Sequence, residues 1–163
     1  MVNLKELTPV TETLNAKSNE VNQIIADLNA KLAKLNIGLS ATTGAIHFGN
    51  WNDALTPIGM DVVSRSRDLF ALGYAKINEQ WQLGIASYTE TQAYENGVPQ
   101  KDSEGDDETE IGGDLEWTPL LQATRSLRIA ALSHVEQLIN EIHRLAKSEI
   151  ETINKARELA DKL

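Results

Sequence analysis

The sequence predicts an α+β fold in which long N-terminal and C-terminal helices pack on a small antiparallel sheet of about three strands. Helical periodicity extends over residues 8–36 and again over residues 118–163. Between them, residues 37–48 and 69–91 are rich in the aromatic and β-branched side chains that favour strands. A chain of 163 residues fits a single domain, residues 1–163.

The predicted N-terminal helix has a marked start and a regular apolar row. Thr8 can cap the helix, and Pro9 suits the first helical position because an N–H there would have no partner anyway. Apolar residues then recur at spacings of four and three, a heptad seam typical of coiled coils and interrupted only by Ser18. At about 1.5 Å per residue this helix is roughly 40 Å long, longer than a small sheet can cover. The seam is therefore a candidate oligomer interface, with packing on the chain's own domain as the alternative; its residues are Leu14, Val21, Ile25, Leu28, Leu32 and Leu35.

The central segment is expected to form a hairpin. Residues 69–77 and 81–89 are rich in strand-type side chains, and the polar residues 78–80 between them can make a tight turn. With residues 37–48 as a third strand, this sheet is too small to be stable alone. It therefore needs the two helices as a cover.

Residues 95–116 are expected to be a flexible acidic loop. They hold nine acidic residues and one lysine, and so carry nearly all of the net charge of −9. Alternate acidic residues in 102–106 match the first ligands of a calcium-binding loop, but Asp107 and Gly113 stand where that loop needs glycine and glutamate. We therefore expect no metal site there. The charge distribution also leaves no broad basic face that would bind nucleic acid.

The C-terminal helix, residues 118–163, repeats the start of the first helix, with Thr118 as the cap and Pro119 at the first position. Its apolar residues form two overlapping rows, which make a stripe wider than a coiled-coil seam requires. A helix that contacts both a sheet and another helix has such a stripe. We therefore expect it to pack beside the N-terminal helix.

The sequence contains none of the common catalytic or cofactor signatures. It has no cysteine, nucleophile elbow, phosphate loop or zinc-protease motif, and His134 and His143 are too far apart to share one helical face closely. We therefore expect no enzyme, no catalytic residue, no metal and no cofactor. No apolar run reaches the roughly 20 residues that span a bilayer, and the N-terminus lacks a secretory signal. A cytoplasmic protein with no membrane partner is expected.

Arginine and tryptophan residues form the one uneven feature of the sequence. A guanidinium binds phosphate or carboxylate through two parallel hydrogen bonds and stacks on aromatic rings. If the fold gathers these residues, they form a site for an anionic, nucleotide-like ligand. Alternatively, the arginines pair with nearby acids and the tryptophans fill the core. The candidate ligand-binding residues are Arg65, Arg67, Arg125, Arg128, Trp51 and Trp117.

From these patterns we expect a non-enzymatic interaction or assembly protein that forms a homo-oligomer, a dimer or higher, through its long amphipathic helices. The alternative is a protein that sequesters an anionic small molecule through the arginine and tryptophan residues. In the first case the partner is another copy of the chain or a different protein. In the second case it is the anionic ligand itself.

Overall fold

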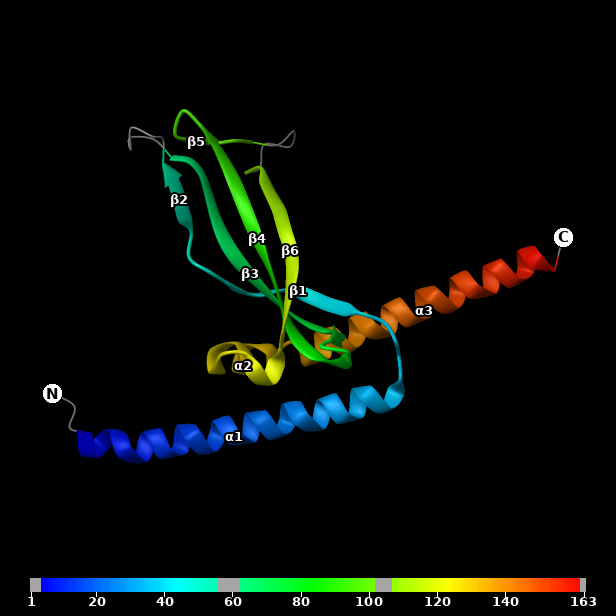
Figure 1. The fold of residues 1–163 in the computed structure, drawn as a ribbon, viewed down its shortest axis with the longest axis horizontal. Helices are drawn as coiled ribbons and strands as arrows, with labels where there is room; N and C mark the ends of the chain where they lie inside the picture. Colours follow the sequence, from blue (N-terminus) through cyan, green and yellow to red (C-terminus); the bar gives the residue numbers. More distant parts are fainter. Residues whose placement is uncertain (1–3, 56–61, 102–106, 162–163) are drawn as a thin grey trace.

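The computed structural model describes residues 4–55, 62–101 and 107–161 of the chain. Within these ranges the fold is of the α+β class, with one sheet whose lower end in Figure 1 rests on the helices. The elements, in chain order, are α1 (Leu4–Leu35), β1 (Ala41–Phe48), β2 (Asn52–Leu55), β3 (Val62–Ile77), β4 (Gln80–Glu95), β5 (Val98–Pro99), β6 (Thr109–Pro119), the 3-10 helix η1 (Leu120–Gln122), α2 (Arg125–Leu132) and α3 (Val135–Ala160).

The sheet is antiparallel and is built on the long hairpin of β3 and β4, which pair along nearly their whole length. Asn78 and Glu79 make the turn. Both have positive φ, 51° and 65°, as a two-residue turn that follows the twist of the strands requires. On one side of the hairpin, β1 pairs with the half of β3 nearer the turn and β2 pairs with the other half. On the other side, β6 pairs with β4.

The prediction of a small sheet of about three strands is wrong, because the described residues form six strands. Two of them overlap residues 95–116, which the sequence predicted to be a flexible acidic loop: all of β5 and most of β6 fall there. The acidic side chains of β6, such as Glu110 and Glu116, are exposed on an edge strand. The alternation typical of a strand is present at Ile111, Leu115 and Trp117, but the glycines at 112 and 113 and the many acidic residues around them conceal it.

The half of the sheet nearer the β3–β4 turn packs on the helices through one face. Leu72 and Tyr74 of β3 and Leu83 and Ile85 of β4 provide the sheet side of this core. Burial of each large apolar side chain contributes roughly 1.5–3 kcal/mol. The helix side of the same buried cluster consists of Ile25, Leu32, Leu120, Ala131, Leu138 and Ile142.

The two long helices contact different parts of the sheet. α1 packs on β4, η1 and α2, whereas α3 packs on β1 and β3. α1 and α3 meet around a groove lined by Leu32 and Leu35 from α1 and by Ile139 and Ala146 from α3. The expectation that the C-terminal helix packs along the first helix is therefore wrong for most of their length.

The predicted helix over residues 118–163 is divided in the structure. Pro119 ends β6 and precedes only the short 3-10 helix η1, and α2 begins after Thr124, whose hydroxyl accepts a hydrogen bond from the backbone N–H three residues later. A break at residues 133–134 separates α2 from α3. Similarly, Pro9 lies inside α1 and not at its first position.

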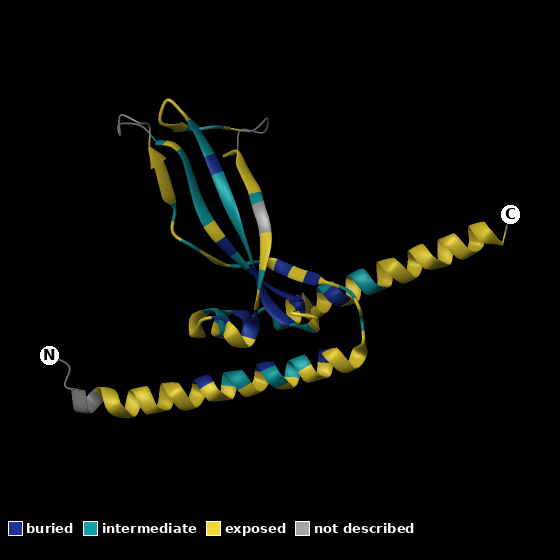
Figure 2. Cartoon of the chain, viewed as in Figure 1, coloured by how far each residue is buried: buried dark blue, intermediate teal, exposed yellow. Residues whose placement is uncertain are grey.

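Both long helices extend beyond the part of the molecule that covers them. Residues 7–17 of α1 and 147–160 of α3 are exposed throughout (Figure 2), and the two segments extend in opposite directions (Figure 1). We call these segments the overhangs of α1 and α3. Among the described helices, none is both long and apolar enough to cross a membrane.

Candidate functional site

The predicted interface residues of the N-terminal helix divide between the core and the surface. Ile25 and Leu32 are buried in the chain's own core, and Val21 and Leu28 are partly buried against it. These four residues therefore stabilise the fold and offer little to a partner. The other two, Leu14 and Leu35, are exposed.

The overhangs carry several large apolar side chains that the rest of the described chain leaves uncovered. On α3, Ile150 is 58% exposed and Ile153 and Leu159 are each 64% exposed. On α1, Val10 and Leu14 line a shallow apolar depression on the helix surface. The overhangs are therefore the first candidate functional surface.

The second candidate surface is an arginine–aromatic cluster on the half of the sheet farther from the turn. Arg65 and Arg67 occupy alternate positions of β3, so both side chains project from the same face. Trp51, one residue before β2, contacts both, with its ring centroid 4.4 Å from the guanidinium carbon of Arg65 and 4.5 Å from that of Arg67. Arg67 also lies 4.5 Å from the centroid of Phe48, and Arg65 lies 5.4 Å from the centroid of Tyr94.

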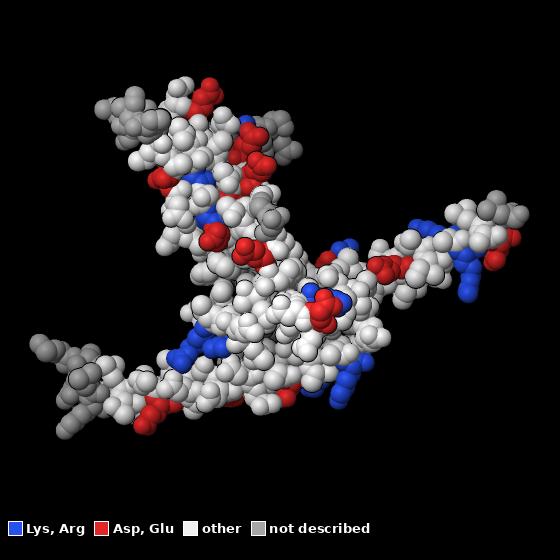
Figure 3. All heavy atoms as spheres, in the orientation of Figure 1, with Lys and Arg blue, Asp and Glu red and all other residues white. Residues whose placement is uncertain are grey.

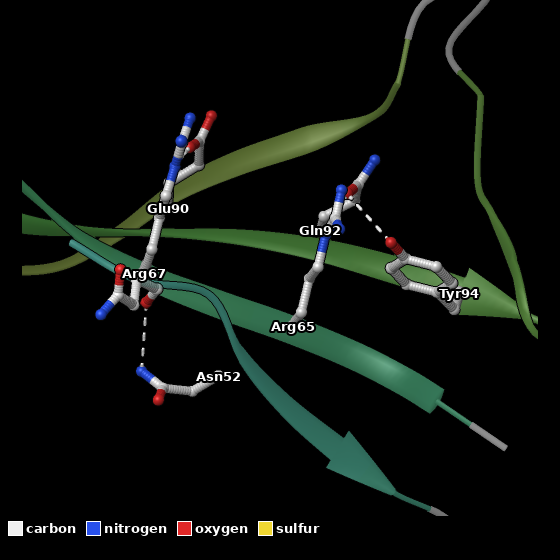
Figure 4. A network of polar contacts seen from close by, with 7 residues as sticks. Asn52, Arg65, Arg67, Glu90, Gln92 and Tyr94 are labelled. Carbon is white, nitrogen blue, oxygen red and sulfur yellow. Dashed lines mark hydrogen bonds and ion pairs between the residues drawn. The ribbon is translucent and has the colours of Figure 1, made fainter. Parts of the chain in front are cut away.

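Hydrogen bonds across the β3–β4 hairpin fix both guanidinium groups (Figure 4). Arg67 Nε donates to Glu90 Oε2 at 2.6 Å, a charge pair that is largely buried. Arg65 Nε donates to Gln92 Oε1 at 2.7 Å, and Gln92 is only 1% exposed. Within the described ranges, no carboxylate oxygen lies within 4.0 Å of the Arg65 guanidinium. Arg65 therefore keeps its positive charge beside a neutral partner, whereas the charge of Arg67 is balanced.

Asp107 lies at the outer end of this cluster. Its carboxylate pairs with Lys101, and this hydrogen bond lowers the pKa of Asp107 below its ordinary value; the nearby Gln92 amide and the positive charge of Arg65 add to the effect. Further acidic side chains gather over the same half of the sheet (Figure 3). The cluster is therefore a small positive site within an acidic region.

The structure brings together only half of the predicted ligand-binding set. Arg65, Arg67 and Trp51 form the cluster. Arg125 and Arg128 lie on α2, where Arg125 donates to Asn15 Oδ1 at 3.1 Å and Arg128 donates to the Leu121 carbonyl at 3.0 Å. The ring of Trp117 covers two strand glycines, Gly73 and Gly84. None of these last three predicted residues belongs to the cluster.

The sequence prediction missed the β4 members of the cluster, Glu90, Gln92 and Tyr94. A signal for the first two was present. A two-residue turn at residues 78–79 places Arg67 opposite Glu90 and Arg65 opposite Gln92, which is the observed register. The predicted strands, residues 69–77 and 81–89, end before these rows, whereas the observed strands continue to Val62 and Glu95.

Within the part of the chain that the structure describes, no three His, Asp or Glu residues are placed to hold a metal ion together. The acidic run considered for calcium, residues 102–106, lies outside the described residues. No family model matches the chain, and no curated protein and no solved structure matches it.

Proposed function

We propose that the protein is a non-enzymatic assembly protein that forms a homo-oligomer by packing its helical overhangs against those of another copy. The observation that carries this proposal is the α3 overhang. Its fourteen residues, 147–160, are all exposed and still present Ile150, Ile153 and Leu159. A helical segment of this kind is completed by a second helix.

The α3 overhang gains little stability from the rest of its own chain. Isolated helices shorter than about 12–15 residues are marginal in water, and most helical stability in proteins comes from packing an apolar stripe. Each large apolar side chain that a partner buries contributes roughly 1.5–3 kcal/mol. Ile150 and Ile153, three residues apart, share one face of the helix, and their burial together supplies enough to order the segment against a partner helix.

The α1 overhang is suited to be that partner. Leu7, Val10 and Leu14 are exposed at spacings of three and four, the spacing of a helix–helix seam. Because the two overhangs extend in opposite directions from the body (Figure 1), the α1 overhang of one copy can lie along the α3 overhang of the other. A two-fold axis repeats this contact, so both overhangs of both copies are covered.

Charge does not oppose this association. The α3 overhang holds three acidic and three basic residues, and the α1 overhang holds one of each. Neither surface has a net charge that would repel its partner. The acidic residues that dominate the net charge of the chain lie instead on the sheet (Figure 3).

The test uses two variants, both altered at residues that the fold does not bury. Ile150→Gln combined with Ile153→Gln removes the apolar seam of the α3 overhang, while Ile111→Gln changes an isoleucine of equal exposure, 64%, on the sheet. We expect native mass spectrometry to give a multiple of 18.0 kDa for the parent and for the Ile111 variant, and 18.0 kDa for the double variant.

A parent protein of 18.0 kDa at every concentration would contradict the proposal, and so would a double variant that keeps the mass of the parent. Substitutions at Leu28 and Leu32 are poor tests of the interface. Since these residues pack in or against the core, polar replacements there destabilise each copy before they affect association.

A further inference from the structure

A trough of about 320 Å³ lies on the face of the sheet opposite the helices. Leu83 and Ile85, which pack on the helices, occupy odd positions of β4, whereas Ala86 and Tyr88, which line the trough, occupy even positions. Since side chains alternate between the faces of a strand, the two pairs point to opposite sides. The complete lining is Thr42, Thr43, Ala86, Tyr88, Ile111, Gly112 and Leu115.

The strand register joins this trough to the arginine–aromatic cluster. Glu90 follows Tyr88 on the same face of β4, and its cross-strand neighbours are Arg67 on one side and Ile111 on the other. One wall residue of the trough therefore lies in the same row as the Arg67–Glu90 pair. Arg65 and Gln92 form the next row outward. The trough and the cluster are one continuous surface.

The charges of this surface favour a ligand that carries a single negative charge. Arg67 is balanced by Glu90 and Lys101 by Asp107, whereas Arg65 is hydrogen-bonded to a neutral amide. A multiply charged anion would be repelled by Glu90, Asp107 and the other acids of this half of the sheet. A carboxylate instead matches the forked geometry of one guanidinium, whose Nη atoms make no hydrogen bond to the described residues.

The spacing of the rows sets the size of the ligand. Residues on one face of a strand repeat every ~7 Å, so the distance from the row of Tyr88 to the row of Arg65, two rows along, is about 14 Å. The trough volume is at the lower end of the range for small-molecule sites, which is about 300–1,000 Å³. We propose that this face binds a monocarboxylate with an extended apolar body, which lies in the trough while its carboxylate binds Arg65.

Decanoate, used below its micellar concentration, is a suitable probe. Two controls accompany it: decan-1-ol keeps the apolar chain without the charge, and acetate keeps the carboxylate without the chain. Binding is measured by isothermal titration calorimetry. We expect decanoate to bind the parent, and both decan-1-ol and acetate to bind at least about tenfold more weakly, because each lacks one part of the recognised pattern. Equal binding of decan-1-ol, or no binding of decanoate, would overturn the proposal.

Two pairs of variants separate this site from a purely structural cluster. Arg65→Gln should weaken decanoate binding by about tenfold or more, while Arg144→Gln, at an exposed arginine of α3, should leave it unchanged. Ile111→Glu should weaken binding more than Ile111→Gln, since it adds a negative charge between the trough and Arg67. If Arg65→Gln folds normally and binds decanoate as the parent does, the cluster has only a structural role.

The site and the proposed assembly are tested independently. The Ile150→Gln/Ile153→Gln variant changes neither the trough nor the cluster, so we expect it to bind decanoate with the affinity of the parent. Loss of binding in this variant alone would contradict a site formed within one copy.

Discussion

Each long element of this fold has a half that the rest of the chain covers and a half that extends beyond it, and α3 shows the contrast most clearly. In its first half, Leu138 is fully buried, whereas in its second half Ile153 is 64% exposed, although both are large aliphatic residues of one amphipathic helix. The difference lies in what faces them: β1 and β3 pack on the first half, whereas residues 147–160 are exposed among the described parts of the chain. Amphipathic spacing therefore shows that a helix needs a partner surface, not that its own chain provides it.

The β3–β4 hairpin is divided in a different way. Its half nearer the turn is held by aliphatic residues such as Leu72 and Leu83, which are fully buried under the helices. Its other half lies away from the described helices and places Arg65 and Arg67 against the ring of Trp51 (Figure 1). The side chains on this half of the sheet thus make cation–π contacts with one another, whereas the apolar side chains of the overhangs remain exposed to solvent. This is why we assign assembly to the helices and ligand binding to the sheet.

The largest expected effect separates the covered and uncovered halves of α3. Leu138→Ala leaves a cavity in the core and should lower the free energy of unfolding by about 2–5 kcal/mol in urea denaturation. Ile153→Ala leaves no cavity within one copy, so its effect should be smaller and should disappear at low protein concentration, where association is lost. A concentration-independent loss of similar size for both variants would remove the distinction between the two halves.

The next largest effect concerns the tight packing of the covered sheet. A Cβ atom added at Gly73 would lie 2.5 Å from Trp117 Cη2 and 2.8 Å from the Ala41 carbonyl oxygen, whereas one added at Gly112 would have no atom within 4 Å. Gly73→Ala should therefore cost about 1–3 kcal/mol through overpacking. Gly112→Ala should be neutral or slightly stabilising. Thermal unfolding of the two variants checks this, and equal melting temperatures would refute the packing that we describe.

A smaller effect is expected in the uncovered sheet. Trp51→Ala removes the ring that both arginines contact and should cost about 1–2 kcal/mol, since cation–π contacts at partly exposed sites contribute about 0.5–1 kcal/mol each. Trp51→Phe should recover part of this stability because it keeps an aromatic face. A loss as large as that of Leu138→Ala would show that the cluster belongs to the core.

The smallest effect is a pH dependence in the covered half. Burial raises the pKa of Tyr74 above its ordinary value of 10.0, because the charged phenolate is poorly solvated there. In the unfolded chain this group loses its proton from about pH 10 upward, while in the folded chain it keeps it, so stability should be constant below pH 10 and fall above it. Tyr74→Phe should reduce this decline in urea denaturation between pH 9 and 11, roughly the range in which tyrosine titrates. An unchanged pH profile would contradict burial as the cause.

The sequence was informative where apolar residues face the core. The helical periodicity predicted over residues 8–36 corresponds to α1, and the apolar positions of residues 69–77 and 81–89 lie in the observed hairpin. The Thr–Pro signal was misleading in both places, because the same dipeptide that can open a helix also ends β6 and lies inside α1. The strand β6 was mistaken for a loop because Gly112 and Gly113 interrupt its alternation and acidic residues dominate its composition, although Ile111, Leu115 and Trp117 mark one apolar face.

The candidate site was predicted in part for a related reason. Trp51, Arg65 and Arg67 are close in the sequence, and the pairing of neighbouring strands keeps them close in space. Arg125, Arg128 and Trp117 depend on how distant elements pack, and no local pattern encodes that. The overhangs were expected only as a helical surface that a small sheet cannot cover; which residues remain uncovered depends on where α1 and α3 meet the sheet.

Hydrogen–deuterium exchange along α3, measured in the parent protein over a range of concentrations, tests the central claim most directly, because it compares the two halves of one helix in one molecule. We expect the amides of the first half, around Leu138 and Ile142, to be protected at every concentration. The amides of residues 147–160 should be protected at high concentration and lose that protection on dilution and in the Ile150→Gln/Ile153→Gln variant. Exchange of residues 147–160 at the rate of an unstructured peptide at every concentration would contradict assembly through the overhangs.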